Sequence, residues 1–103
     1  MYIVIFVTAP DKKEARCIAE LLIKKRLVAC VNILDKIESF FWWEGKIDKT
    51  KEALLIIKSK KEKFTKIIKA VKSVHSYEVA EIIALPIISG FRPYLRWIDE
   101  SVR

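Results

Sequence analysis

The sequence has little of what catalytic and cofactor-binding motifs are built from. It contains one histidine, two cysteines and two glycines among 103 residues. It has no Gly-rich phosphate loop, no Ser-His-acid order, no paired acidic motif and no H-x-E followed by C-x-x-C. We therefore expect a protein that is not an enzyme.

The two cysteines, Cys17 and Cys30, are too few for a disulfide framework and lack the C-x-x-C spacing of a zinc site. We predict that each is a small buried hydrophobic residue. One alternative stays open at Cys30, because its thiolate is a soft ligand of the kind that Cu⁺ prefers. A buried thiol without a cationic neighbour is inert, which favours the structural interpretation.

Long apolar runs are also missing, although 52% of the residues are hydrophobic. No segment approaches the roughly 20 apolar residues that a membrane-spanning helix needs. The longest run, Tyr2 to Val7, has the length of a strand, and no basic segment precedes it as in a signal peptide. We expect a cytoplasmic protein without a membrane partner.

Positive charge is plentiful, with 20 basic against 13 acidic residues and a net charge of +7. Much of the excess is lysine, without the glycine-rich or exposed aromatic motifs of nucleic-acid-binding domains, so nucleic acid is not favoured as a partner. The chain also has no glutamine and one asparagine. This bias towards Lys, Glu and Ile resembles thermostable proteins from hot environments.

The first apolar segment, Tyr2 to Val7, is β-branched and aromatic without polar alternation, which predicts a central strand buried on both faces. Asp11 and Glu14 then form a capping-box-like helix start. The helix that follows has an apolar stripe at helical spacing. This stripe consists of Ala15, Ile18, Ala19 and Leu22.

A long β-hairpin is predicted next. Its first strand runs from about Leu27 to Trp43, and its return strand runs from Lys46 to Ile57. The turn lies at Glu44-Gly45. The tip carries four consecutive aromatic residues, Phe40 to Trp43.

A second amphipathic helix follows the hairpin. Its apolar stripe consists of Phe64, Ile67, Ile68, Val71 and Val74. Lysines recur three apart on the side away from this stripe, at Lys60, Lys63, Lys66, Lys69 and Lys72. We interpret them as a solvated face and not as a phosphate track.

A fourth strand is predicted over Val79 to Leu85, and Pro93 suits the first turn of a short final helix. The order is therefore βαββαβ with an additional C-terminal helix. It predicts an α+β, ferredoxin-like fold: a four-stranded antiparallel sheet with both main helices on one face. We expect residues 1–103 to form a single domain.

Two helices cover only one face of such a sheet, yet the first strand is apolar on both. Either Ile3, Ile5 and Val7 or Val4 and Phe6 must face away from the helices. Burying each such side chain is worth roughly 1.5–3 kcal/mol. We therefore expect a closed homo-oligomer in which hairpin arms extend the sheets of adjacent subunits.

Several short segments stand out along the chain. They are Thr8-Ala9-Pro10-Asp11, Ala29-Cys30-Val31-Asn32, Trp43-Glu44-Gly45-Lys46, Ile57-Lys58-Ser59, His75-Ser76-Tyr77-Glu78, Glu81-Ile82, Leu85-Pro86-Ile87 and Tyr94-Leu95-Arg96-Trp97-Ile98. Together these segments resemble the signatures of the CutA divalent-cation tolerance family. They occur in the family's order and cover nearly the whole chain. The resemblance implies a cytoplasmic homotrimer associated with tolerance of copper and other divalent metal ions.

The resemblance also bears on the metal ligands. Copper-linked bacterial members carry a cysteine in the first strand and a His-His pair, where this chain has Val7 and Val74-His75. His75 is therefore the one candidate ligand of that set that is present, and Glu78 is close to it in sequence. We predict weak binding of copper or another divalent cation at His75 and Glu78, with donors from another subunit. The alternative that stays open is that this lone histidine is a capping or hydrogen-bonded residue of the fold.

A second hypothesis places a small-molecule ligand in a cleft between subunits, since the family is similar in topology to the PII signalling trimers, whose ligand pockets lie between subunits. The candidate cleft residues are Trp43, Lys58, His75, Tyr77, Glu81, Tyr94 and Trp97. A lysine, a carboxylate and several aromatic rings suit a small anionic or planar ligand. They equally suit subunit packing, and this alternative remains open. A PII-like sensor of this kind would act by docking another protein.

Overall fold

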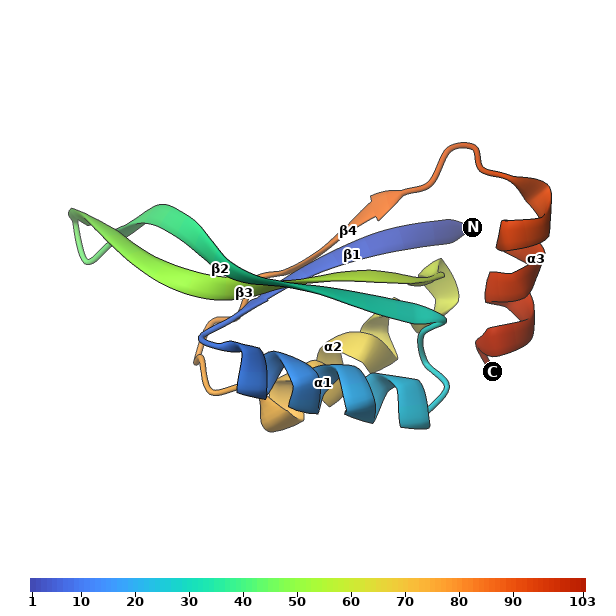
Figure 1. Ribbon diagram of the computed structural model, residues 1–103, viewed down its shortest axis with the longest axis horizontal. Coiled ribbons are helices and arrows are strands. Elements are labelled where there is room, and N and C mark those ends of the chain that lie inside the picture. Colours follow the sequence, from blue (N-terminus) through green and yellow to red (C-terminus); the bar gives the residue numbers. More distant parts are fainter.

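The computed structural model describes all residues, 1–103, as four strands and three α-helices (Figure 1). In chain order they are β1 (Tyr2–Ala9), α1 (Lys12–Lys24), β2 (Cys30–Trp43), β3 (Lys46–Lys60), the 3₁₀ turn η1 (Lys61–Lys63), α2 (Phe64–Val74), β4 (Ile82–Pro86) and α3 (Arg92–Ser101). The strands form one sheet in the order β2-β3-β1-β4, and every pair of neighbours is antiparallel. The ferredoxin-like prediction is confirmed.

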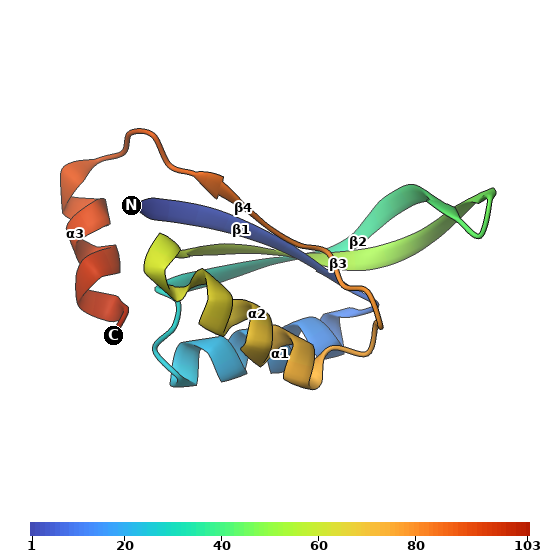
Figure 2. The same cartoon turned by 180° about the vertical axis from the view of Figure 1, so that it is seen from behind.

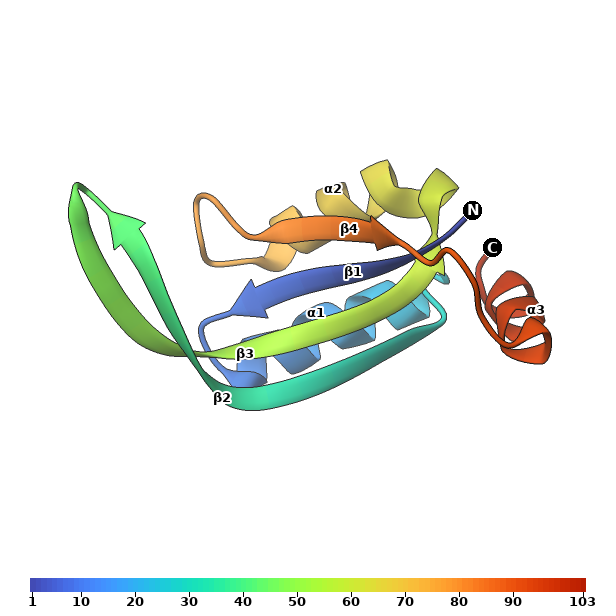
Figure 3. The same cartoon turned by 90° about the horizontal axis from the view of Figure 1, so that it is seen from above.

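Helices α1 and α2 lie side by side against one face of the sheet, and α3 stands beyond the ends of the strands (Figures 1 and 2). Seen from above, the other face of the sheet has no helix over it (Figure 3). The C-terminal helix α3 therefore does not cover the face opposite α1 and α2. We call the two sides of the sheet the helix-covered face and the open face.

Asp11 caps helix α1 as predicted, because its Oδ1 accepts a hydrogen bond from the Glu14 backbone N–H at 2.8 Å. The Glu14 carboxylate does not complete a capping box and instead bonds to Ser76. Cys17 is exposed, so the prediction of burial is wrong there. Cys17 points away from the stripe of α1, whose buried residues Ala15, Ile18 and Leu22 all lie on the opposite side of the helix.

Three strand boundaries differ from the sequence prediction. Strand β3 continues past Ile57 to Lys60, so the assignment of Lys60 to the solvated face of the second helix is wrong: Lys60 is half-buried in the strand. Strand β2 begins at Cys30 and not near Leu27, because Leu27 is buried in the loop, where its carbonyl accepts a hydrogen bond from the Ser59 hydroxyl at 2.6 Å. Strand β4 begins at Ile82 and ends with Pro86. Proline is tolerated there because β4 is an edge strand.

Strand β1 is central, but it is fully buried on one face only. Ile3, Ile5 and Val7 are at most 3% exposed and face the helices. Val4 and Phe6 are half-buried and lie on the open face. The prediction of burial on both faces is therefore wrong for a single chain, whose two main helices cover one side of the sheet.

The register shows which residues share the open face. Across the sheet, Cys30 pairs with Lys58, Lys58 with Val4, and Val4 with Leu85. The next row, in the same order of strands, is Asn32, Ile56, Phe6 and Ile83. Leu34, Ile83 and Leu85 remain 42–50% exposed. The open face is thus largely apolar and lacks cover from its own chain.

The β2–β3 hairpin extends far beyond the helices and makes the molecule 44 Å long (Figure 1). Its turn is Glu44-Gly45, as predicted, and both residues have positive φ, 50° and 77°, as a two-residue type I′ turn requires. A bulge between Leu34 and Ile37 shifts the register of the arm. Phe40, Trp42 and Ile47 near the tip are 66–72% exposed.

Candidate functional site

The side chain of His75 is 1% exposed and lies between the end of β1 and helix α1. Its Nε2 is 2.7 Å from the Thr8 carbonyl oxygen, and the Tyr77 backbone N–H donates to its Nδ1 at 3.0 Å. In this arrangement Nε2 faces an acceptor, the Thr8 carbonyl, and Nδ1 faces a donor, the Tyr77 N–H. Both ring nitrogens of His75 are therefore occupied within the chain.

A chain of polar contacts surrounds this histidine. Glu14 Oε2 lies 3.4 Å from His75 Nδ1 and accepts hydrogen bonds from the backbone N–H and the hydroxyl of Ser76, both at 3.0 Å. The Tyr77 hydroxyl donates to Glu52 Oε2 at 2.8 Å. Burial, and then the hydrogen bond to Glu52, raise the pKa of Tyr77 well above its usual value. The network fastens the segment after α2 to α1 and β3.

This arrangement does not form a metal centre within one chain. No three carboxylate, imidazole or thiol groups lie close enough together to hold a metal ion. Glu78 is exposed, and His75 offers no free nitrogen unless the bond to Thr8 or to Tyr77 opens. The residues of a single chain therefore do not fit a preformed copper site.

Lys58 lies on the open face in strand β3, whose neighbours in the sheet are β2 and β1. Its ammonium group donates a hydrogen bond to Asn32 Oδ1 and lies 3.9 Å from Cys30 Sγ. Cys30 is half-buried and has this cationic neighbour, so the expectation of a buried thiol without one is wrong. Sequence alone missed the contact because Cys30 and Lys58 are 28 residues apart and meet only through the β2–β3 register.

The other predicted cleft residues are spread over the molecule. Trp43, at the hairpin tip, is separated from Lys58 by about 40 Å along β3. The rings of Tyr94 and Trp97 pack on α3 with their centroids 5.5 Å apart. Burial, and then the nearby Cys30, raise the pKa of Tyr94. Glu81 is exposed just before β4.

The predicted set thus falls into three places in one chain. His75 and Tyr77 meet near the end of β1, Lys58 lies on the open face with Tyr94 near Cys30, and Trp43 lies at the tip. A single chain does not bring these places together. Sequence reasoning missed Glu14 and Glu52, because only the folded chain places both carboxylates beside the segment that follows α2.

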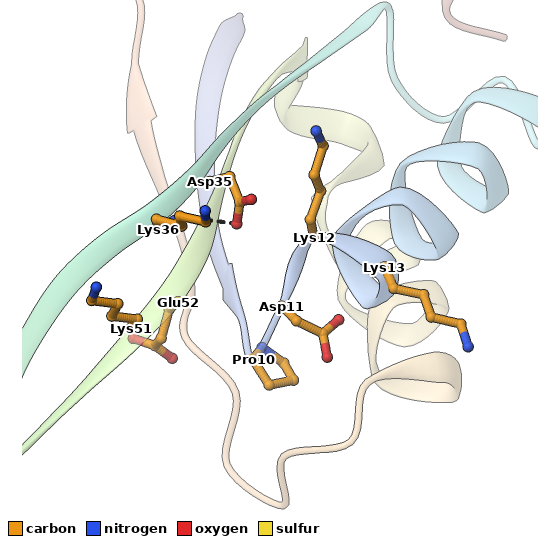
Figure 4. Close-up of a pocket in the computed structure, with 8 residues that line it drawn as sticks. All are labelled: Pro10, Asp11, Lys12, Lys13, Asp35, Lys36, Lys51 and Glu52. Atoms are coloured by element: carbon orange, nitrogen blue, oxygen red, sulfur yellow. Dashed lines mark hydrogen bonds between the residues drawn. The ribbon is translucent and has the colours of Figure 1, made fainter.

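A charged cleft of about 370 Å³ lies between the start of α1, the bulge of β2 and strand β3 (Figure 4). Its lining consists of Pro10, Asp11, Lys12, Lys13, Asp35, Lys36, Lys51 and Glu52. The side chains of Lys12, Lys13 and Lys51 point in different directions and do not converge on one point (Figure 4). None of the predicted site residues lines this cleft.

The helices of the chain are short. The longest, α1, has 13 residues. None has both the length and the apolar composition needed to cross a bilayer.

The chain is similar to proteins of known family over its whole length. The CutA1 divalent ion tolerance protein family matches residues 3–101. The divalent-cation tolerance protein CutA of Archaeoglobus fulgidus is 48% identical over 102 residues, which cover 99% of each chain. Human protein CutA is 46% identical over 95 residues, which cover 92% of this chain and 53% of that protein. The chain thus spans about half the length of this relative.

Solved structures agree with these relationships. The structure of the A. fulgidus protein, described as periplasmic, covers 100% of both chains with a TM-score of 0.97. The divalent cation tolerance protein of Thermus thermophilus covers 100% of both chains with a TM-score of 0.98 at 41% identity. Sequence and fold lead to the same conclusion: this chain belongs to the CutA1 divalent ion tolerance protein family.

Proposed function

We propose that the chain works as a cytoplasmic homotrimer that binds divalent cations, copper among them, weakly and without catalysing a reaction. Membership of the divalent ion tolerance family supports the cation. The observation that carries the assembly is the open face of the sheet, where Leu34, Ile83 and Leu85 are exposed beside the half-buried Val4 and Phe6. An apolar surface of this kind is typical of an interface.

The hairpin supports the same assembly. Its arm leaves the helical layer (Figure 3), and the aromatic side chains at its tip are exposed. An arm that extends the sheet of a neighbour makes a head-to-tail contact, and such contacts close into a ring when the rotation permits. The number three is the expectation from the family resemblance.

Native mass measurement and sedimentation at micromolar concentration test the assembly. We expect a trimer with no detectable monomer. The aspartate variant Ile83→Asp places a charge on the open face and is expected to dissociate it, whereas Ile88→Asp, at a position 92% exposed outside the strands, is the matched control. A stable wild-type monomer would refute the proposal.

For the cation we propose His75 and Glu78 as ligands in the assembled protein, with further donors from another subunit. Ligation at His75 requires one of its two hydrogen bonds to open, which is consistent with weak binding. Copper titration by calorimetry of the wild type, His75→Ala and Glu78→Gln tests this. Both variants should lose affinity, and unchanged binding in His75→Ala removes His75 from the site.

The compartment is part of the proposal. Both cysteines are free thiols, which is the common state in a reducing cytoplasm. The A. fulgidus neighbour is described as periplasmic. Fractionation of cells that express the native gene decides between the two compartments.

A second candidate function is a PII-like sensor that holds a small ligand between subunits and acts on a protein partner. The observation that favours it is Lys58, a half-buried cation on an apolar face. In this hypothesis, the cleft residues Trp43, Tyr77, Glu81, Tyr94 and Trp97 come together only across subunits. A thermal-shift screen of nucleotides and organic acids, repeated with Lys58→Ala, tests it, and the absence of any stabilising compound counts against it.

A further inference from the structure

Two lysines on the same face of β3 differ in one respect. Lys58 and Lys60 are two residues apart, so both side chains lie on the open face, and both are half-buried. Lys60 Nζ lies 3.6 Å from Asp99 Oδ1, a carboxylate on α3. Lys58 is in none of the ion pairs of the chain. One lysine therefore has a counterion and the other has none.

The surroundings of Lys58 offer no alternative negative charge. Its hydrogen-bond partners are the Asn32 amide oxygen and the Cys30 sulfur. Its neighbour across β1 is Val4, and the row ends at Leu85. The row on one side, from Asn32 to Ile83, contains no carboxylate. Next to the row on the other side, the Asp99 carboxylate is already held by Lys60 and the Tyr2 hydroxyl.

If another subunit covers this face, the lack of a counterion for Lys58 becomes unfavourable in free energy. An ammonium group that is removed from water without a partner of opposite charge loses several kcal/mol of hydration. The proposed trimer would do this to three Lys58 side chains at once, in copies that each carry a net charge of +7. A cleft that is lined by charges of one sign and by low-dielectric protein concentrates ions of the opposite sign.

We propose that Lys58, together with Asn32 and Cys30, forms a binding site for a small oxyanion, a carboxylate or a phosphate group, on the open face of the sheet. Asn32 and Cys30 orient the ammonium group by accepting hydrogen bonds from two of its three N–H groups, which leaves the third for the anion. The proposal rests on the assembly proposed above, because cover by another subunit is what removes Lys58 from water.

The test is a titration of inorganic phosphate, and separately of malonate, followed by thermal unfolding at constant ionic strength held with chloride. We expect a saturable rise of the unfolding temperature with at least one of the two anions, because a ligand of the native state stabilises it by mass action. Lys58→Met should weaken the apparent affinity at least tenfold. Lys60→Met, which removes the lysine that already has a counterion, should change it less than twofold.

Two results would overturn the proposal. The first is a wild type with no saturable response to either anion; if the Lys58→Met trimer also dissociates, the counterion of Lys58 is a carboxylate of another subunit. The second is a Lys58→Met variant that responds as the wild type does.

Two further measurements keep these outcomes separate. If Lys58→Met does not fold, Lys58→Arg retains the charge and should keep the anion response, whereas Asn32→Ala should weaken it. Sedimentation of each variant reports the assembly independently. A monomeric wild type refutes the trimer, and an anion response that is absent from an intact trimer refutes the site.

Discussion

The two faces of the sheet are built from similar residues and have different surroundings. On the helix-covered face, Ile5, Val7, Leu55 and Ile57 are completely buried under α1 and α2. On the open face, the neighbouring Ile56 is only half-buried. The two faces therefore do not differ in residue composition. They differ in whether helices of the same chain pack against them. An apolar face that its own chain leaves open is the observation on which the proposed assembly rests.

The polar groups on the two sides of the sheet also differ in their partners. On the covered side, His75 is hydrogen-bonded to Thr8 and Tyr77, and Glu14 accepts two hydrogen bonds from Ser76. On the open side, Lys58 meets only neutral partners. A satisfied network stabilises the chain by itself, whereas an unpaired charge on a face that is to be covered requires something from outside the chain.

The largest effect is expected on the covered face. Leu55→Ala removes a side chain that is 0% exposed and leaves a cavity between β3 and the helices. We expect a loss of about 2–5 kcal/mol in the free energy of unfolding. Guanidinium unfolding at fixed protein concentration measures it, and a loss below about 1 kcal/mol would show that this face is less tightly packed than the structure indicates.

The adjacent residue tests the open face. Ile56→Ala truncates a half-buried side chain, and if copies of the chain cover this face the loss should reach about 1.5–3 kcal/mol. Much of that loss should appear as weaker association, so the unfolding midpoint of the variant should depend more steeply on protein concentration. A smaller loss that does not change with concentration would mean that Ile56 stays exposed in solution.

A third prediction concerns the polar contact between Tyr77 and Glu52. Tyr77→Phe removes a hydrogen bond to a carboxylate and should cost about 1–2 kcal/mol at pH 7. The folded protein raises the pKa of Tyr77, so this contribution is complete below pH ~10, the unfolded pKa of tyrosine, and is lost as the pH rises through the folded value. Urea unfolding from pH 7 to 11.5 should therefore show the two proteins converging only at the alkaline end.

Tyr94→Phe is the control for that pH profile, because the Tyr94 hydroxyl has no hydrogen-bond partner within the chain and its pKa is raised mainly by burial. It should cost less than Tyr77→Phe at pH 7. A profile for Tyr77→Phe that stays parallel to the wild type up to pH 11.5 would contradict the role assigned to Glu52.

Much of the fold followed from local patterns. Asp11 predicted the start of α1, and Glu44-Gly45 predicted the turn. The apolar residues on both faces of β1, with two main helices for one sheet, predicted that one face would lack helical cover. These features depend on residues close in sequence, for which spacing and propensity carry the information. Cys17 was misjudged because its type was weighed without its angular position on the helix.

The candidate site was predicted less well than the fold, because its contacts depend on strand register and join segments that are distant in sequence. The pairing of Cys30 with Lys58 requires knowing how far the hairpin strands slide past each other, which the bulge after Leu34 alters. The bond from Tyr77 to Glu52 joins residues 25 apart on different elements. No local pattern encodes either contact, and proximity across subunits is further still from the sequence of one chain.

The smallest effect is expected where the open face ends. Asp99 Oδ2 accepts a hydrogen bond from the Tyr2 hydroxyl at 2.5 Å, and Oδ1 pairs with Lys60, which ties α3 to β1 and β3. Asp99 is 47% exposed, so solvent screens the pair, and Asp99→Asn should cost about 0.2–1 kcal/mol, less in 1 M salt. Glu100→Gln, an exposed neighbour without an ion pair, is the control and should be neutral. A loss above about 2 kcal/mol, unaffected by salt, would mean that another copy of the chain buries Asp99, so that the covered part of the open face extends to α3.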